Sequence, residues 1–102
     1  MKSDRVVLLA TADLLFRAKL DAVVQRAGWR SVRQGSAEIA VVELTGQTAL
    51  EEVRRLVSGG ATVLAFGPHV HHELLRDART AGARAVPNSQ IETVLARVLS
   101  DT

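Results

Sequence analysis

Three uninterrupted apolar runs, separated by stretches with helical periodicity, most strongly limit the folds open to this chain. The runs are VVLLA at residues 6–10, IAVVEL at 39–44 and ATVLAF at 61–66. A strand that is apolar at almost every position is buried on both faces, as in a parallel sheet covered by helices. Strands of this kind that alternate with helices over short loops predict an α/β domain with helices on both faces of a parallel sheet.

The stretch 13–28 between the first two strands has the pattern of an amphipathic helix. Phe16, Leu20, Val23 and Ala27 fall on one helical face. Gly28 is placed to end the helix in a left-handed conformation. We therefore predict a helix that packs this stripe against the sheet.

Later helices are predicted from their end signals. Thr48 and Glu51 form the pattern of a capping box at the start of one helix. Ser89 and Glu92 repeat that pattern at the start of the last one. Between them we predict a helix over residues 72–81, which stops at Gly82, and a short strand over residues 84–86.

Residues 29–33 (WRSVR) fit this alternation least well. If they form a strand beside residues 6–10, only residues 34–38 remain to bring the chain across to residue 39. That path is roughly 19 Å, from about 3.3 Å per strand residue and about 4.8 Å between strands, whereas about five extended residues reach about 17 Å. We therefore predict no helix in this crossover, and a second strand that is short, displaced or missing.

Composition narrows the possible classes of protein. The chain has 102 residues, of which 47% are hydrophobic, which predicts a single domain over residues 1–102 with its own core. Cysteine is absent, so disulfide and thiol chemistry are excluded. No apolar run reaches the roughly 18 residues of a membrane span, and the charges of Asp4, Arg5 and Asp13 argue against a secretory signal. We expect a cytoplasmic protein without a membrane partner.

Charge and aromatic content argue against nucleic acid as a partner. Four arginines gather around the first helix and its exit, at positions 17, 26, 30 and 33, but the net charge is only +2. Aromatic residues make up 3% of the chain and tyrosine is absent, so side chains for base stacking are lacking. We interpret these arginines as a solvated helix face.

Longer segments resemble the receiver domain of two-component response regulators. VVLLATADLLFRAKL resembles the first strand, acidic turn and first helix of a receiver, IAVVELTG its phosphoacceptor strand, and VLAFGPHVHHELLRDARTAGARAVPNS the part from the switch strand to the fifth strand. Segments such as FRAK also resemble degenerate receiver-like proteins. The resemblance implies the flavodoxin-like or CheY-like three-layer α/β fold, with a parallel sheet of four or five strands and without the helix between strands 2 and 3.

The resemblance also implies where phosphotransfer chemistry would lie. A receiver holds Mg²⁺ with an acidic pair after its first strand, and a histidine kinase passes a phosphoryl group to an aspartate after the third strand. Here the acidic pair falls on Thr11 and Ala12, with Asp13 beside them, and the phosphoacceptor position falls on Glu43. The metal-binding and acceptor positions are therefore both altered.

The positions that would bind the phosphoryl oxygens are altered as well. The switch hydroxyl falls on Gly67, and the lysine position falls on Asn88 or Ser89. No lysine follows Lys19. Because a transferred phosphoryl group needs a metal and cations to spread its charge, we predict that this pocket is degenerate and performs no catalysis.

Two further hypotheses concern single side chains. Glu43 is either a permanent mimic of the phosphorylated state or a solvated or locally hydrogen-bonded carboxylate. His69, His71 and His72 raise the question of a metal site that includes Glu43. Their spacing at a helix start does not converge on one ion, so we predict neither a metal nor any other cofactor.

We predict a non-catalytic pseudo-receiver that binds a protein partner. By resemblance the binding face comprises the last two helices and the strand between them, with His72, Arg76, Arg79, Arg84, Glu92 and Arg97. An alternative is a ligand- or metal-responsive switch at the strand ends, formed by Asp13, Glu43 and His69. We expect Trp29 to pack between the first helix and the sheet, with an exposed Trp29 that anchors an interface as the alternative. An exposed edge strand could pair two copies into a homodimer.

Overall fold

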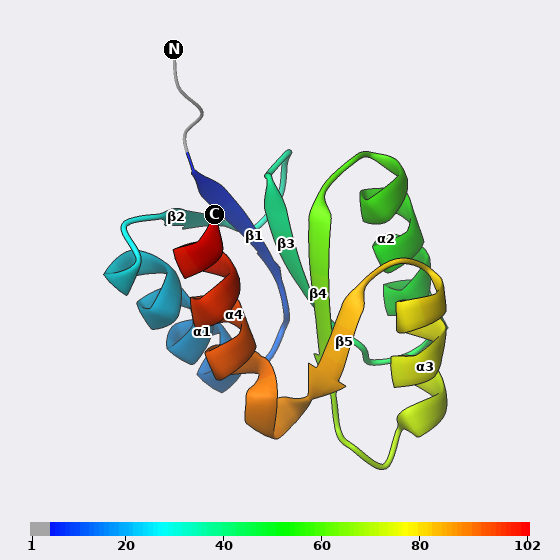
Figure 1. Ribbon diagram of the computed structural model, residues 1–102. Coiled ribbons are helices and arrows are strands. Elements are labelled where there is room, and N and C mark those ends of the chain that lie inside the picture. Colours follow the sequence, from blue (N-terminus) through cyan, green and yellow to red (C-terminus); the bar gives the residue numbers. More distant parts are fainter. Residues whose placement is uncertain (1–4) are drawn as a thin grey trace.

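The computed structural model describes residues 5–102 (Figure 1). Its strands are β1 (Val6–Ala10), β2 (Arg30–Val32), β3 (Ile39–Glu43), β4 (Thr62–Gly67) and β5 (Arg84–Pro87). Its helices are α1 (Leu14–Arg26), α2 (Gln47–Ser58), α3 (His72–Thr80) and α4 (Ile91–Asp101), with a 3₁₀ turn, η1 (Asn88–Gln90), before α4. Within the described residues, no helix combines the length and apolar character that a membrane span requires. Asp4 and the three residues before it in the predicted domain lie outside the described range.

The strands form one parallel sheet in the order β2-β1-β3-β4-β5. The three apolar runs of the sequence are β1, β3 and β4, which occupy the middle of the sheet. Their inner residues are buried because helices cover both faces. This arrangement confirms the predicted α/β fold with a parallel sheet.

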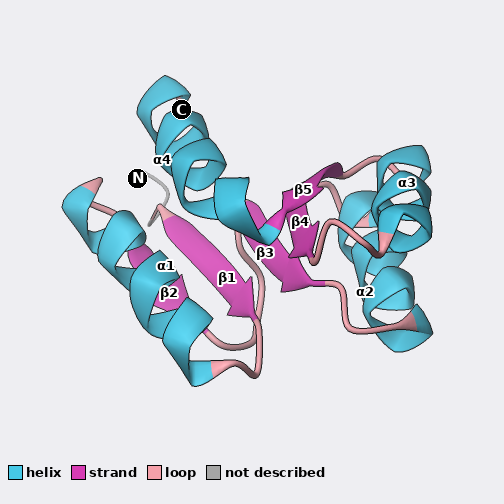
Figure 2. Ribbon diagram, turned by 90° about the horizontal axis from the view of Figure 1, so that it is seen from below, coloured by secondary structure: helices cyan, strands magenta, loops and turns pink. Residues whose placement is uncertain are grey.

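Each face of the sheet has its own apolar core. Helices α1 and α4 lie against one face (Figure 2), where Leu20 and Leu95 are buried. Helices α2 and α3 lie against the other face, where Leu50 is buried. Successive strand residues point to opposite faces, so Val41 belongs to the first core and Val42 to the second.

The crossover after β2 contains no helix, as predicted, and β2 is short. Val6 pairs with Arg30 and Leu8 with Val32, and residues 33–38 then lead directly to β3. Trp29, just before β2, is only 5% exposed and packs in the core beneath α1. The expectation that Trp29 packs between α1 and the sheet is therefore confirmed, and the alternative of an exposed tryptophan anchor is wrong.

The predicted helix stops are correct, but the predicted capping boxes are wrong. Gly28 and Gly82 have φ angles of +83° and +110°, which favour glycine. Helix α2 begins at Gln47, so Thr48 lies within its first turn and makes no cap bond. Ser89 lies in the 3₁₀ turn that leads into α4 and makes no cap bond either. Both side chains follow the point where the backbone has already turned helical, whereas an N-cap residue needs an extended backbone.

The buried stripe of α1 differs from the predicted one at its end. Leu20 and Val23 are buried as predicted, and Val24 is buried as well. Ala27 is exposed because the helix ends at Arg26, and Ala27 is its C-cap. The rotation of the last turn therefore places Val24, rather than Ala27, against the sheet.

Candidate functional site: the strand-end pocket

The turns that follow the strands meet at one edge of the sheet, drawn at the bottom of Figure 1 and seen from below in Figure 2. In a parallel sheet the carboxyl ends of the strands share one edge, which is where ligands bind in this class of fold. Thr11 and Asp13 follow β1, Glu43 ends β3, Gly67 ends β4 and Asn88 follows β5. All positions that the resemblance assigns to phosphotransfer are thus at this edge.

A hydrogen bond joins the acidic-pair position to the phosphoacceptor position. Thr11 Oγ1 donates to Glu43 Oε1 over 2.5 Å, and Thr11 is only 5% exposed. The same hydroxyl oxygen accepts a bond of 3.3 Å from the backbone N–H of Asp13. The geometry supports the interpretation of Glu43 as a locally hydrogen-bonded carboxylate, since a neutral hydroxyl stands beside it where a receiver would place a metal-binding acid.

Asp13 serves the helix that follows it. Its Oδ1 accepts from the backbone N–H groups of Leu15, at 2.9 Å, and Phe16, at 3.0 Å, and so caps α1. A side-chain cap of this kind satisfies donors that the first helical turn leaves free. The neighbouring Ala12 is exposed and has no side-chain ligand atom. The acidic turn therefore starts a helix and offers no second carboxylate toward Glu43.

A cavity of about 320 Å³ opens beside the Thr11–Glu43 contact, between the ends of β1 and β3 and the start of α2. Its polar lining consists of hydroxyl and carboxylate side chains, contributed by Thr11, Glu43, Thr45, Thr48 and Glu52. Gly67, Asn88 and Ser89 do not line it. Leu44 stands against Gly67, because a β-carbon there would lie 3.5 Å from both Leu44 Cβ and the Leu44 carbonyl oxygen. The cavity therefore extends toward α2 rather than across to β4 and β5.

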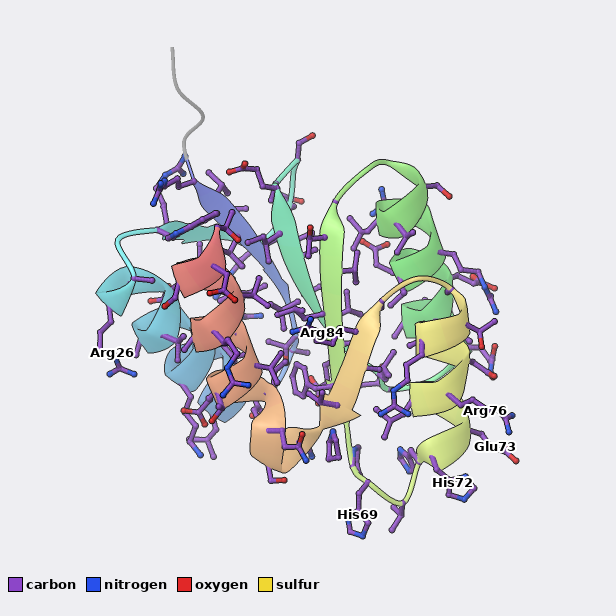
Figure 3. All side chains as sticks on the ribbon, viewed as in Figure 1. Arg26, His69, His72, Glu73, Arg76 and Arg84 are labelled. Carbon is purple, nitrogen blue, oxygen red and sulfur yellow. The ribbon has the colours of Figure 1, made fainter. Side chains whose placement is uncertain are left out.

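The histidines lie apart from the strand-end contact. His69, His71 and His72 are all exposed, in the loop after β4 and at the start of α3. Figure 3 shows His69 at the tip of that loop and His72 directed outward from α3. Within residues 5–102 no three side chains of His, Cys, Asp or Glu are grouped so that they could hold one metal ion. The structure does not bring the histidines together with Glu43.

The predicted partner face surrounds the β5 edge of the sheet. Its members lie on α3, β5 and α4, and they are His72, Arg76, Arg79, Arg84, Glu92 and Arg97. All are exposed except Glu92, which is half-buried, and Figure 3 shows His72 and Arg76 pointing away from the sheet. Arg79 donates from Nε and Nη2 to the carbonyl oxygen of Ala85, at 3.0 and 2.7 Å. These bonds tie α3 to β5 across the face.

Arg17 departs from the predicted solvated helix face, because it is half-buried. Its Nη2 donates to the backbone carbonyl oxygen of Thr11 over 2.6 Å, whereas its buried Nε has no partner among the described residues. No spacing pattern in the sequence indicates this bond. Arg33 is exposed and lines cavities on the two sides of β2.

Thr11→Val is expected to lower the free energy of unfolding by about 1–2 kcal/mol, because it leaves the Glu43 carboxylate without its donor. Thr11→Ser keeps the hydroxyl group and is the control, with a smaller expected loss. Urea denaturation followed by circular dichroism measures both variants. Equal losses for valine and serine would show that the hydrogen bond does not stabilise the fold.

Comparison with known proteins relates this structure to receivers. No protein-family model matches the chain, and no curated protein matches it by sequence. A response regulator from Thermotoga maritima is 13% identical, with a TM-score of 0.78 and 97% of each chain covered. The BeF3-activated DrrB receiver domain is 12% identical, with a TM-score of 0.79 and 97% of each chain covered. HP1043, an orphan response regulator of H. pylori, is 16% identical, with a TM-score of 0.72 and 98% of each chain covered.

These similarities cover nearly the whole chain at low sequence identity, so they establish the fold and leave the chemistry open. The strand order agrees with them, because 2-1-3-4-5 is the order of flavodoxin-like and CheY-like sheets. The missing helix between β2 and β3 is a departure within that plan. The chain thus has the α/β fold of response-regulator receiver domains.

Proposed function

We propose that this receiver-like domain takes no part in phosphotransfer and acts by binding a protein partner. The observation that carries the proposal is the hydrogen bond from Thr11 to Glu43 at the strand ends. By resemblance, a receiver has a metal-binding acid at the first of these positions and the phosphoacceptor at the second. A hydroxyl bonded to a glutamate provides neither function.

The surrounding side chains support the same proposal. Stabilising a transferred phosphoryl group requires a metal ion and positive charge near its oxygens. Asp13 caps α1, Ala12 has no ligand atom, and the lysine position holds Asn88. Glu43 is the carboxylate at this contact, and Glu52, which also lines the neighbouring cavity, is paired with Arg55.

We place the binding surface on α3, β5 and α4, by resemblance to receivers, and the protein in the cytoplasm on the same ground. The bidentate bond of Arg79 to the Ala85 carbonyl supports this surface, because it holds two of its elements in a fixed relation. A surface that is ordered before binding loses less entropy when a partner docks. No catalytic step belongs to this function.

A second candidate function is a ligand-responsive switch at the strand ends. The cavity of about 320 Å³ favours it, since Glu43 and Thr45 both line that space. Asp13 and His69, which the sequence assigned to such a switch, do not line the cavity. A switch would therefore depend on Glu43 and on the hydroxyl groups near α2.

The proposal predicts that phosphoryl donors and their mimics leave the protein unchanged. The experiment is an amide NMR titration with Mg²⁺ and then beryllofluoride, combined with intact mass measurement after incubation with acetyl phosphate. We expect no shifts and no gain of a phosphoryl group, because Thr11, Ala12 and Asn88 stand where a receiver, by resemblance, has its acidic pair and its lysine. The DrrB receiver domain, whose structure is BeF3-activated, is the positive control.

Two outcomes would contradict the proposal in different ways. A phosphoryl mass gain that disappears in Glu43→Gln would show that phosphotransfer survives. Amide shifts limited to residues around the cavity, without a mass gain and absent in Glu43→Gln, would support the ligand-responsive switch instead.

A further inference from the structure

The two edges of the sheet are protected to different extents. At the β5 edge, the Arg79 guanidinium donates two hydrogen bonds to the Ala85 carbonyl oxygen. At the other edge, no described strand pairs with the outer side of β2. No helix follows β2 either, because residues 33–38 contain none. An edge strand left in this state is a template for a further strand.

The direction of one bond identifies the backbone groups that are available on β2. The N–H of Arg30 donates inward to the carbonyl oxygen of Arg5 over 3.0 Å. Successive residues of a strand direct their N–H and C=O groups to opposite sides. The backbone groups of Ser31 therefore face outward, where an added strand would pair with them.

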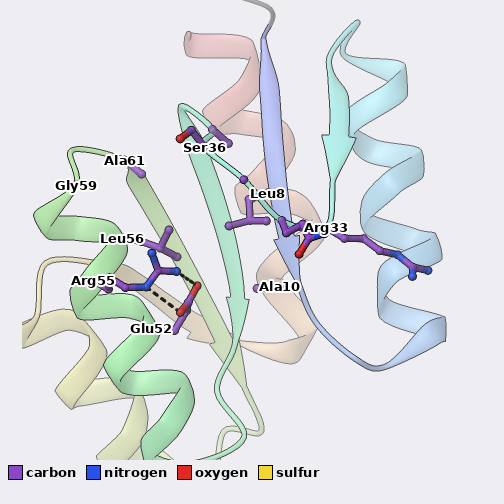
Figure 4. A pocket seen from close by; sticks show the side chains of 12 residues that line it. Leu8, Ala10, Arg33, Ser36, Glu52, Arg55, Leu56, Gly59 and Ala61 are labelled. Atoms are coloured by element: carbon purple, nitrogen blue, oxygen red, sulfur yellow. Dashed lines mark hydrogen bonds and ion pairs between the residues drawn. The ribbon is translucent and has the colours of Figure 1, made fainter.

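Cavities flank this edge on both faces of the sheet. One, of about 420 Å³, lies between α1 and β2, and its lining includes Leu14, Ala18 and Arg33. The other, of about 430 Å³, lies between the crossover and α2, and its lining includes Ala37 and Leu56 (Figure 4). The second occupies the side of the sheet where α2 and α3 pack and where the crossover brings no helix. A strand added to β2 would direct alternate side chains toward these two spaces.

The charges beside the edge favour an acidic occupant. Among the described residues, Arg33 has no ion pair or hydrogen bond from its side chain, and Figure 4 shows it directed away from the α2 cavity, toward α1. Asp21, in the same α1 cavity, already accepts bonds from Ser31 Oγ at 2.5 Å and Gln25 Nε2 at 2.6 Å. Arg55, on the other side, is paired with Glu52. Unlike Asp21 and Arg55, the guanidinium of Arg33 is therefore available to pair with a carboxylate of a partner.

An apolar contact lies next to this charge. Leu14 is 73% exposed, although leucine is a residue that folded proteins usually bury. It lines the α1 cavity together with Ala18 and Arg33. A segment that fits must therefore present both an apolar side chain and a carboxylate on the face directed to α1.

We propose that the β2 edge binds an extended segment of a protein partner as a sixth strand, with apolar side chains against Leu14 and an acidic side chain against Arg33. Main-chain bonds to β2 give such a contact its affinity, and alternate side chains give it specificity. The inference rests on the proposed function as a binding module and names the class of partner. It concerns the edge opposite the α3, β5 and α4 surface.

A second copy of this chain is a poorer occupant. Strand β2 and the residue after it read Arg30-Ser31-Val32-Arg33. A second β2 edge would bring no carboxylate to Arg33, because residues 30–33 contain none. An acidic segment would supply this opposite charge, which is stabilising across a strand pair.

The test uses two synthetic peptides of about seven residues, roughly 23 Å when extended. In the first peptide, valine and glutamate occupy every second position in turn, with threonine between them, so that both kinds of side chain can face α1. The second peptide has lysine in place of glutamate. Titration followed by amide NMR is expected to shift Ser31, Val32 and Arg33 with the glutamate peptide only. Ser31→Pro, which removes the outward N–H, is expected to abolish binding. Ser31→Ala keeps the N–H and is the control for the lost hydroxyl bond to Asp21.

Charge reversal gives an independent measurement. Arg33→Glu is expected to weaken the glutamate peptide by about fivefold, corresponding to an exposed ion pair, and to favour the lysine peptide. Arg54→Glu, the same change on the exposed face of α2, is expected to alter neither affinity. If Ser31→Pro fails to fold, the comparison of Arg33→Glu with Arg54→Glu tests the proposed binding at the β2 edge.

Three results would overturn the inference. The first is an absence of shifts at the β2 edge with both peptides, and the second is equal glutamate-peptide affinity for wild type and Arg33→Glu. The third is a dimer, detected by analytical ultracentrifugation, that Ser31→Pro dissociates, because the edge would then belong to a second copy. None of these results changes what is expected from the phosphoryl-donor experiment, which tests the proposed function. Failure of the β2-edge inference can therefore be told apart from failure of the proposed function.

Discussion

Phe66→Ala is expected to lower the free energy of unfolding by about 3–5 kcal/mol, the usual cost of removing a fully buried phenylalanine. The Phe66 side chain is 0% exposed and belongs to the core under α1 and α4. Its ring lies 5.0 Å from that of Phe16, centroid to centroid, at a tilt of 51°. It is the largest of the fully buried side chains among the described residues, so truncation to alanine leaves a large cavity in this core.

Urea denaturation, monitored by circular dichroism, measures this loss as a shift of the midpoint at constant slope. Phe66→Leu keeps most of the volume and is the control, with an expected loss below about 1.5 kcal/mol. Natural domains have only about 5–15 kcal/mol of stability, so the alanine variant will be partly unfolded if the total is at the low end. Equal losses for the two variants would mean that the core closes around the smaller side chain.

Gly82→Ala is expected to lower the free energy of unfolding by about 2–4 kcal/mol, from backbone strain together with a steric clash. Gly82 has a φ angle of +110°. A β-carbon at this position would lie only 2.9 Å from Val57 Cγ1, where the end of α3 meets α2. Either the backbone or the valine side chain must move.

Gly28→Ala is the matched control for the strain alone. Gly28 has a φ angle of +83°, and a β-carbon there would meet nothing within 4 Å. Its expected loss is therefore about 1 kcal/mol. Adding Val57→Ala to Gly82→Ala should recover part of the larger loss, as a double-mutant cycle would show. If the two glycine variants lose the same stability, the Val57 contact has no energetic role.

The fold could be predicted because its signals are local and repeated. Continuous apolar runs such as 39–44 can be buried only between two layers of helices, and β3 is indeed buried on both faces. Gly28 and Gly82 act as predicted stops because an uncommon backbone angle is a property of a single residue. The short crossover followed from arithmetic on chain length. The capping boxes failed because Thr48 and Ser89 match a motif whose geometry depends on where the preceding turn places the backbone.

The sequence predicted where the residues of the candidate site lie in the fold, but it could not predict which of their side chains are in contact. The residues at the ends of the parallel strands were identified correctly, since topology alone brings those ends to one edge. That Thr11 would bond to Glu43, that Leu44 would stand against Gly67, and that the cavity would open toward α2 depend on packing between residues far apart in the chain. The burial of Trp29 was expected, but exposure stayed an alternative for the same reason, because burial depends on the space that α1 leaves above the sheet.

The amino-acid sequence alone was enough to predict the order of strands and helices along the chain, the absence of a helix after β2, and which residues follow the strands. These follow from periodicity, chain length and residue identity, which act within a few residues. Three features depend on the packed structure: how Glu43 is bonded, which sheet edge Arg79 covers, and that Arg33 has no side-chain partner among residues 5–102. These depend on which distant side chains meet, and that is settled only when the helices pack against the sheet.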